Sequence, residues 1–356
     1  MDKLLDRIVI TKPDDWHVHF RDGEMLDAVI FDTVKQFSRA IIMPNLADAI
    51  KTTKMAENYR SKILDSFARL KKNNQIPQEN TFTPLMTIYL TDDTKPEEVL
   101  SAHSSGFIFA FKLYPAASTT NSSAGVTNLF GNCRKVLEKL QYVGMPLLIH
   151  AELPDKNIDI FDRERFFIDR ILISLRRDFP DIKLVFEHVS TKEGVDFVME
   201  DTGPIAATVT PQHLIYNRNS LFSGGLNPHF YCLPILKAEE HRQAILKAVF
   251  SGSKRFFLGT DSAPHNRSLK ENRCGCAGCY NAYNAMALYA SVFEANNSID
   301  KLEAFASFNG PDFYGLPRNR DFLVLYRKEN IIPDMLEIGK IQLVPLGAGS
   351  VIHWNI

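Results

Sequence analysis

The sequence lacks several features that would assign it to a class directly. It has five cysteines in 356 residues, and a small odd number fits a reducing compartment better than a disulfide framework. No apolar run approaches the roughly 20 residues that a membrane helix needs. The first residues, MDKLLDRIVITKPDDW, have no long apolar core like that of a signal peptide. We therefore expect a cytoplasmic protein with no membrane partner.

An excess of either charge is also lacking. The formal net charge is -1, whereas a nucleic-acid or anionic-membrane partner would need a basic excess. A small acidic substrate is not excluded, because one local arginine is enough to bind it. With 45% hydrophobic residues, the chain can bury a large core without a structural metal. We expect residues 1–356 to form a single domain, and any metal in it to be catalytic.

Short apolar runs alternate with helical patterns along the chain. The runs are continuously apolar, as in strands that are buried on both faces. The expected strands are 16–20, 40–45, 82–90, 109–114, 146–150, 183–188, 205–210 and 255–260, and the expected helices include 54–72, 128–144, 237–252 and 280–296.

Eight strands separated by helices predict an α/β fold, a (β/α)8 TIM barrel of parallel strands. A doubly wound open sheet is the alternative, but no Gly-x-Gly-x-x-Gly follows the first strand. We expect the barrel core to span about residues 13–316. Strand-like pieces at 322–326 and 341–344 predict a short C-terminal appendage over about residues 318–356.

The first expected strand carries the motif His17-Val18-His19. Residues i and i+2 of a strand point the same way, so His17 and His19 project together and can bind one metal. Alone the pair is a weak signal, because two histidines can also lie in a loop without a shared role.

Further polar residues fall at the ends of other expected strands, where barrel enzymes place their catalytic groups. The fifth, sixth and eighth strands end at His150, His188 and Asp261. A single histidine at a strand end is more often structural. Four imidazoles and a carboxylate together are hard to explain by packing, because buried polar groups need partners. This set predicts a metal site, suited to zinc and less selectively to cobalt, manganese or nickel.

Lys112 interrupts the apolar fourth strand, FAFKLYP. A protonated lysine cannot bind a metal, and it could simply reach the barrel rim or pair with Asp261. If its amine reacts with carbon dioxide, however, the resulting carbamate has two oxygens that could bridge two cations. Two metals about 3.5–4 Å apart would share a hydroxide and polarise a carbonyl, and Asp261 beside them would suit general acid–base catalysis.

Longer blocks carry a family resemblance. In chain order they are PDDWHVHFRDG, MPNL, FKLYPAASTTNSS, MPLLIHAE, FEHVST, TPQHL, YCLPILK, FLGTDSAPH and CGCAGC. Together they closely resemble the single-function bacterial dihydroorotases of the amidohydrolase superfamily. The resemblance implies reversible hydrolysis and cyclisation between (S)-dihydroorotate and N-carbamoyl-L-aspartate, in de novo pyrimidine biosynthesis. It also implies a homodimer.

The resemblance implies a binuclear centre, typically of two zinc ions, with a metal-bridging hydroxide. One metal would be bound by His17, His19 and Asp261. The other would be bound by His150 and His188, with carboxylated Lys112 as the bridge. Asp261 would act as the general acid and base.

The resemblance also implies a substrate site. Its carboxylate would be bound by side chains, and a guanidinium fork matches a carboxylate well. A lid loop over 115–125 would donate further hydrogen bonds. The implied residues are Arg21, Asn45 and His265 for the carboxylate, Leu233 and Ala277 through their backbone, and Thr119 and Thr120 in the lid. Read without the family, Arg21 could instead form a surface ion pair, and Asn45 could be a turn residue.

Three alternatives remain at this point. The cluster Cys274, Cys276 and Cys279 looks like a zinc knuckle, but three thiolates need a fourth ligand, and the resemblance implies a glycine-rich loop near the substrate. A hydantoinase or dihydropyrimidinase would share the metal centre without needing a carboxylate clamp. An inactive dihydroorotase-like scaffold would lack metal ligands, and here every expected ligand is present.

Overall fold

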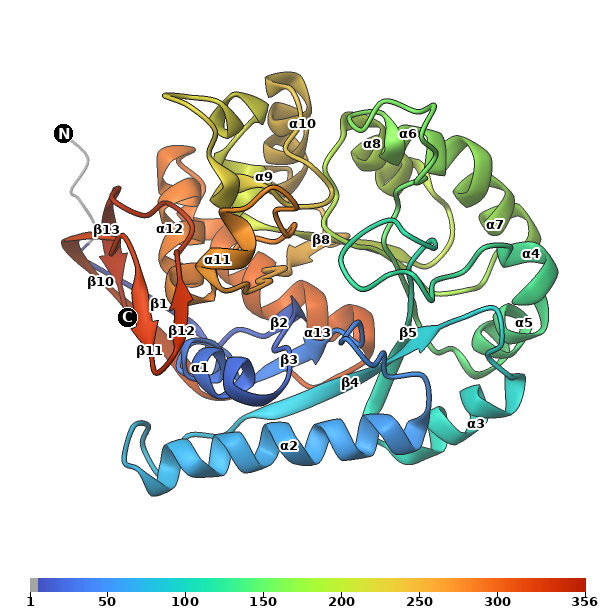
Figure 1. Ribbon diagram of the computed structural model, residues 1–356, viewed down its shortest axis with the longest axis horizontal. Coiled ribbons are helices and arrows are strands. Elements are labelled where there is room, and N and C mark those ends of the chain that lie inside the picture. The colour runs from blue at the N-terminus through green and yellow to red at the C-terminus, as the bar shows by residue number, and fades with distance from the viewer. Residues whose placement is uncertain (1–5) are drawn as a thin grey trace.

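A computed structural model describes residues 6–356 and contains an eight-stranded parallel barrel (Figure 1). Its strands pair in chain order: β2 (Asp15–Val18), β3 (Arg39–Ile42), β4 (Thr83–Leu90), β5 (Ile108–Leu113), β6 (Leu147–Ile149), β7 (Leu184–Phe186), β8 (Ile205–Val209) and β9 (Phe256–Leu258). The segment after β9 returns to β2, where Asp261 N donates to His17 O at 2.8 Å and His19 N donates to Ser262 O at 3.0 Å. The predicted (β/α)8 barrel is confirmed, with strands shorter than expected.

Helices surround the barrel (Figure 1). The longer ones are α1 (Gly23–Val34), α2 (Thr53–Lys72), α3 (Pro96–Ser105), α5 (Arg134–Val143), α8 (Lys192–Glu200), α10 (Glu239–Phe250) and α12 (Ala285–Ala295). The shorter ones are α4 (Leu129–Asn132), α6 (Arg163–Phe167), α7 (Ile173–Asp178), α9 (Pro211–Ile215), α11 (Arg267–Lys270) and α13 (Asn309–Tyr314).

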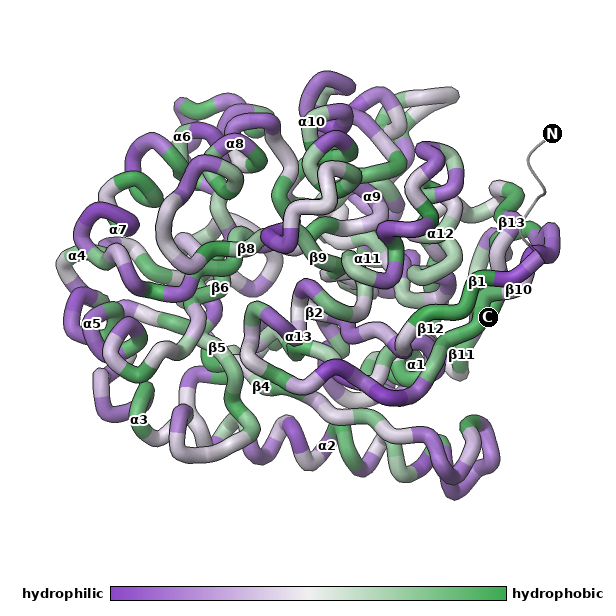
Figure 2. Tube along the Cα trace, turned by 180° about the vertical axis from the view of Figure 1, so that it is seen from behind, coloured by the Kyte–Doolittle hydropathy of each residue, from purple (hydrophilic) through white to green (hydrophobic). Residues whose placement is uncertain are grey.

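Helix α2 shows how local sequence produces these elements. The side chain of Thr52 caps its first turn by accepting from Met55 N at 3.2 Å. Tyr59, Ile63 and Phe67 follow at spacings of four and are buried. Figure 2 shows hydrophobic and hydrophilic stretches alternating along this helix.

Two expected helices differ in their extent. The helix expected over 128–144 is divided at Cys133 into α4 and α5, where Gly131 and Asn132 are weak helix formers. Gly144 caps the end of α5 with a φ of 69°, as its position in the sequence predicts. The helix expected over 280–296 begins only at Ala285.

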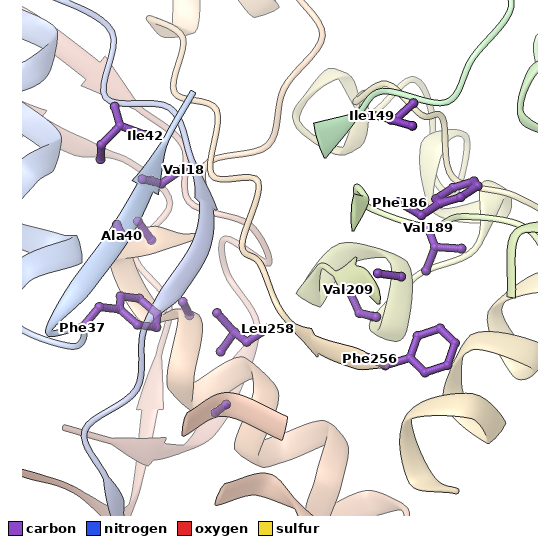
Figure 3. Close-up of a cluster of buried hydrophobic side chains, with 14 of the residues drawn as sticks. Val18, Phe37, Ala40, Ile42, Ile149, Phe186, Val189, Val209, Phe256 and Leu258 are labelled. Carbon is purple, nitrogen blue, oxygen red and sulfur yellow. The ribbon is translucent and has the colours of Figure 1, made fainter. Parts of the chain in front are cut away.

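The barrel interior has an apolar floor and a polar mouth. Its floor is one cluster of buried side chains that includes Ile41, Leu85, Ala110, Leu148, Val185, Ala206 and Phe257. Alternate residues of a strand share a face, so residues two positions further along β5 to β8 also face inward. These are the buried polar residues Lys112, His150, Glu187 and Thr208. The intervening residues, such as Phe186 and Val209, belong to a second cluster that is partly drawn in Figure 3.

A small sheet lies beside the barrel. The C-terminal strands β10 (Phe322–Ile331) and β13 (Val351–Asn355) pair with β1 (Arg7–Thr11) in the order β1-β10-β13, and β11 (Leu336–Ile338) and β12 (Ile341–Leu343) form a hairpin. The sequence analysis predicted no strand in the N-terminal segment. Trp354 fixes this sheet to α12, because its buried indole Nε1 donates to Glu294 Oε2 at 3.0 Å.

The two faces of β1 give a direct test of this arrangement. Ile10 is 3% exposed and Val9 is 48% exposed. We expect Ile10→Ala to lower the free energy of unfolding by roughly 2–4 kcal/mol, because it leaves a cavity. The control Val9→Ala should change it by less than about 1 kcal/mol. Urea denaturation measures both, and equal effects would contradict the packing of β1 on the barrel.

Candidate active site

Three predicted metal ligands meet at the mouth of the barrel. Asp261 Oδ1 lies 3.2 Å from His17 Nε2 and 3.1 Å from His19 Nε2, and the two imidazole nitrogens are 3.3 Å apart. All three side chains are buried. One atom from each residue therefore points at a common position, as the strand pattern of His17 and His19 predicts.

A buried carboxylate determines which nitrogen of His17 carries the proton. Glu187 Oε2 lies 2.6 Å from His17 Nδ1 and also accepts from Thr208 Oγ1 at 2.6 Å. The His17 Nδ1–H therefore donates to Glu187, which leaves the Nε2 lone pair facing Asp261 and His19. Lone pairs that face one another repel, and a cation between them removes the repulsion. This donor set fits a metal ion.

A second pair of imidazoles lies next to the first. His150 Nδ1 is 3.2 Å from His188 Nε2, and His150 Nε2 donates to Glu152 Oε2 at 2.9 Å. The rings of His17 and His188 have centroids 5.1 Å apart. The four predicted histidines thus form one continuous cluster. His188 Nδ1 has no hydrogen-bond partner, although it is buried.

Lys112 is buried in the same cluster without a hydrogen-bond partner. Its Nζ lies 5.0 Å from the centre of the Tyr114 ring and makes no hydrogen bond within residues 6–356. Burial lowers the pKa of this amine to about 8, against the opposing effect of Glu187 and Asp261. A larger share of the amine is therefore neutral near neutral pH than for an exposed lysine.

Three of the four imidazoles in the cluster have lowered pKa values, whereas burial of His17 is outweighed by the charges of Glu187 and Asp261, which raise its pKa. Burial lowers the pKa of His19 to about 3, and it also lowers the pKa values of His150 and His188. Burial alone would raise the pKa of Asp261, but the neighbouring histidines hold it well below its usual value. Neutral imidazoles beside an ionised carboxylate are ligands for zinc and similar cations.

The backbone bends where two strands deliver their ligands. His188 and Asp261 have φ angles of 41° and 45°, and Arg21 just beyond the histidine pair has 61°. Non-glycine residues adopt this left-handed region rarely and at an energetic cost. His188 directly follows the inward-facing Glu187, so regular alternation would turn it outward. The bend brings its side chain to the cluster.

The predicted substrate residues line a cavity above the metal ligands. Its wall includes Arg21, Asn45, Tyr114, Thr119, Thr120, Leu233, Ala263, Ala277 and Gly278. Arg21 Nη2 lies 3.0 Å from His265 Nε2. The same His265 Nε2 atom is 3.0 Å from Ala277 O. Arg21 Nη1 and Asn45 Oδ1 are buried and unpartnered, so both can bind a ligand.

The lid loop lies over this cavity. Asn45 Nδ2 donates to Thr120 O at 3.1 Å, and Asn121 Nδ2 donates back to Asn45 O at 3.2 Å. On the opposite wall, Thr120 Oγ1 donates to Ala277 O at 3.3 Å. These contacts hold the loop predicted to be a lid against residues of the cavity wall.

All predicted site residues are therefore near one another. Of the thirteen predicted residues, eleven belong to the cavity wall. His265 contacts Arg21 of this wall, and Lys112 lies over the ring of Tyr114. Sequence reasoning missed the supporting residues Glu152, Glu187, Thr208 and Tyr114. For Glu152, Tyr114 and Glu187 the available signal was a position two residues after a ligand or one residue before it, as in HAE and FEH, whereas Thr208 had no such signal.

The cysteine loop does not form a zinc knuckle. Cys274 is exposed, whereas Cys279 is buried and its Sγ contacts His229 O at 3.3 Å. Among residues 6–356, the one group with three converging His, Cys, Asp or Glu ligands is His17, His19 and Asp261. Cys133 and Cys232 are buried, as expected of packing residues.

Comparison with known proteins identifies the class. The model of the Amidohydrolase family matches residues 10–319. The chain therefore belongs to the amidohydrolase family, in agreement with its barrel and its histidine–aspartate cluster.

Individual relatives indicate which group of amidohydrolases the chain is most similar to. The dihydroorotase of Cupriavidus pinatubonensis is 54% identical over 352 residues, which cover 99% of each chain. The dihydroorotase of Nitrosomonas europaea is 51% identical over the whole of both chains. The crystal structure of dihydroorotase from Saccharomyces cerevisiae, in complex with 5-fluoroorotic acid, has a TM-score of 0.88 and 30% identity, and covers 99% of this chain and 98% of that chain. Within the amidohydrolases, the chain belongs with the dihydroorotases.

The hydrogen bond between Glu187 and His17 generates a prediction. In Glu187→Gln the acceptor becomes neutral and weaker, so the Nε2 lone pair of His17 is less basic. We expect metal affinity to fall by roughly 10–100-fold. Competition with a chelator measures it.

The control for this experiment is Glu98→Gln. Glu98 also accepts hydrogen bonds, from Thr53 N and Oγ1, but it lies on helix α3 outside the cavity wall. The Glu98→Gln substitution should leave metal affinity unchanged. Equal metal affinity in the Glu187 and Glu98 variants would show that Glu187 does not tune His17.

Proposed function

We propose that this chain interconverts (S)-dihydroorotate and N-carbamoyl-L-aspartate, the opening and closing of a cyclic amide. One observation carries the proposal: four imidazoles and a carboxylate converge beneath a cavity whose wall presents a buried, unpaired arginine nitrogen. The first part suits metal-assisted hydrolysis, and the second suits an acidic substrate.

We further propose two zinc ions at the site, with His17, His19 and Asp261 holding one and His150 and His188 the other. Carboxylated Lys112 would be their bridge, which is consistent with its burial beside both groups and its lowered pKa. When bound, such ions supply Lewis acidity, which lowers the pKa of water and polarises the reacting carbonyl.

The protein's own groups bind and orient the substrate. Arg21, Asn45 and His265 would hold its carboxylate at one end of the cavity. The backbone of Leu233 would contact the ring amide, and the backbone of Ala277 would contact the carboxylate. Thr119 and Thr120 would close the lid, and exclusion of water strengthens each of these interactions.

Asp261 moves the proton in this proposal. Its carboxylate is ionised and lies between the metal ligands and the cavity. In the hydrolytic direction it accepts a proton from the attacking water and delivers it to the leaving ring nitrogen. In the biosynthetic direction it removes a proton from the ureido nitrogen that attacks the side-chain carboxylate, and it delivers this proton to the carboxylate oxygen, which leaves as water when its C–O bond breaks.

We also propose a cytoplasmic homodimer. All five cysteines are free thiols, which is consistent with a reducing compartment. Among residues 6–356 there is no helix with the length and apolar character needed to cross a membrane.

Metal removal tests the function directly. We expect turnover of dihydroorotate to be lost on chelation and restored by zinc. Dihydrouracil, which lacks the carboxylate, should be a much poorer substrate. Turnover that survives complete metal removal would overturn the proposal, and a preference for dihydrouracil would favour a dihydropyrimidinase.

Asp261→Asn separates proton transfer from metal binding. We expect turnover to fall by roughly 10²–10⁴-fold, because an amide cannot accept the proton. Elemental analysis should find metal still bound, since the amide oxygen keeps its place beside His17 and His19. Near-wild-type turnover with bound metal would remove Asp261 from the proton path.

A further inference from the structure

A buried lysine outside the predicted site joins two loops of the cavity wall. Lys270 is the last residue of α11 and is 4% exposed. Its Nζ donates to Tyr231 O at 2.8 Å, to Cys276 O at 2.9 Å and to Gly278 O at 2.7 Å. An ammonium group has three N–H donors, so none remains for a ligand. Any effect of Lys270 on a substrate must therefore act through these loops or through its charge.

The three carbonyls flank two backbone donors of the cavity. Ala277 lies between Cys276 and Gly278, and Leu233 follows two residues after Tyr231. Both Ala277 and Leu233 line the cavity. Within residues 6–356, neither of their backbone N–H groups donates to another protein group. Lys270 thus fixes the peptide unit that contains the Ala277 N–H, through Cys276 O, and the peptide unit that precedes the one with the Leu233 N–H, through Tyr231 O.

The same two loops are joined by a further contact. Gly278 N donates to Tyr231 O at 2.9 Å, so this carbonyl accepts from both Gly278 and Lys270. Gly278 has a φ of 146°, and a Cβ atom there would lie 2.6 Å from Ala263 O. The loop is therefore closely packed at Gly278, and the hydrogen bonds of the Lys270 ammonium group hold it there.

Lys270 also contributes an uncompensated charge. Neither Lys270 nor Arg21 forms an ion pair with a carboxylate in the described part of the chain. Burial lowers the pKa of both groups, and their charges oppose each other. Buried cations without a counter-ion are unfavourable, and an anion bound in the cavity relieves this cost.

We propose that Lys270 is a positioning residue for the substrate's carboxylate end: it holds the backbone N–H group of Ala277 in place and adds positive potential behind it. The inference rests on the proposed function, and it extends the predicted clamp to a residue that does not touch the substrate. In this proposal, the selectivity of the cavity for anions depends on a backbone held in a fixed position as well as on the charge of Arg21.

The variant Lys270→Met tests this role, because methionine keeps similar bulk without the ammonium group. We expect KM for dihydroorotate to rise roughly 10–100-fold, with kcat changed less than about threefold and zinc content retained, because the metal ligands are untouched. The control Lys62→Met removes an exposed lysine that pairs with Asp22, and it should leave KM unchanged.

Inhibitor binding separates this role from a purely structural one. Orotate carries the carboxylate and uracil does not. We expect Lys270→Met to weaken the binding of orotate by the same factor by which it raises KM. The weaker inhibition by uracil should be unchanged. Equal losses for both inhibitors, parallel loss of zinc and kcat, or unchanged KM would each overturn the inference.

If circular dichroism shows that Lys270→Met does not fold, Lys270→Gln decides the question. Its amide retains two N–H donors for the loop carbonyls, so KM should rise by a smaller factor. An unchanged KM in this variant would overturn the inference. The wild-type protein is assayed in parallel, and its failure to turn over dihydroorotate would refute the proposed function instead.

Discussion

The site depends on lone pairs that face one another in a buried space. The Nε2 atoms of His17 and His19 and the Oδ1 of Asp261 lie within 3.3 Å of one another. Glu187 holds the proton of His17 on the opposite nitrogen. A cation at the centre of this arrangement would be within reach of all three atoms. The surrounding barrel must therefore be rigid enough to keep the ligands together, and the apolar floor below them provides that support.

Much of this site is predictable from sequence because it depends on local periodicity. In parallel strands the carboxyl ends meet, and alternate residues share a face, so His17, His19 and His150 could be brought together without a structure. Their partners were harder to predict. Glu187 is 170 residues from His17, and no local pattern connects them. His188 even violates the alternation and reaches the cluster only through its left-handed backbone.

The same reasoning explains the missed elements elsewhere. The N-terminal strand Arg7–Thr11 is only five residues long. Its alternation of exposed and buried residues, with Ile8 and Ile10 buried, indicates a strand only once its pairing with a strand more than 300 residues away is known. The sequence does not distinguish Lys270 from other lysines, because the three groups that accept its hydrogen bonds are backbone carbonyls. Backbone acceptors carry no residue-type signature. Sequence analysis therefore identifies ligands by their chemistry but overlooks the residues that hold loops in place.

The division between barrel and loops also explains how relatives with the same fold differ. The L-hydantoinase of Arthrobacter aurescens has a TM-score of 0.78 at 15% identity, so it shares the fold alone. In this chain, the strands deliver the imidazole and carboxylate cluster, whereas Arg21, His265 and Ala277 belong to the segments beyond the strand ends. Arg21 has no carboxylate partner within the described chain, so its charge is available to a ligand, and in the proposed function this unpaired charge gives selectivity for an acid.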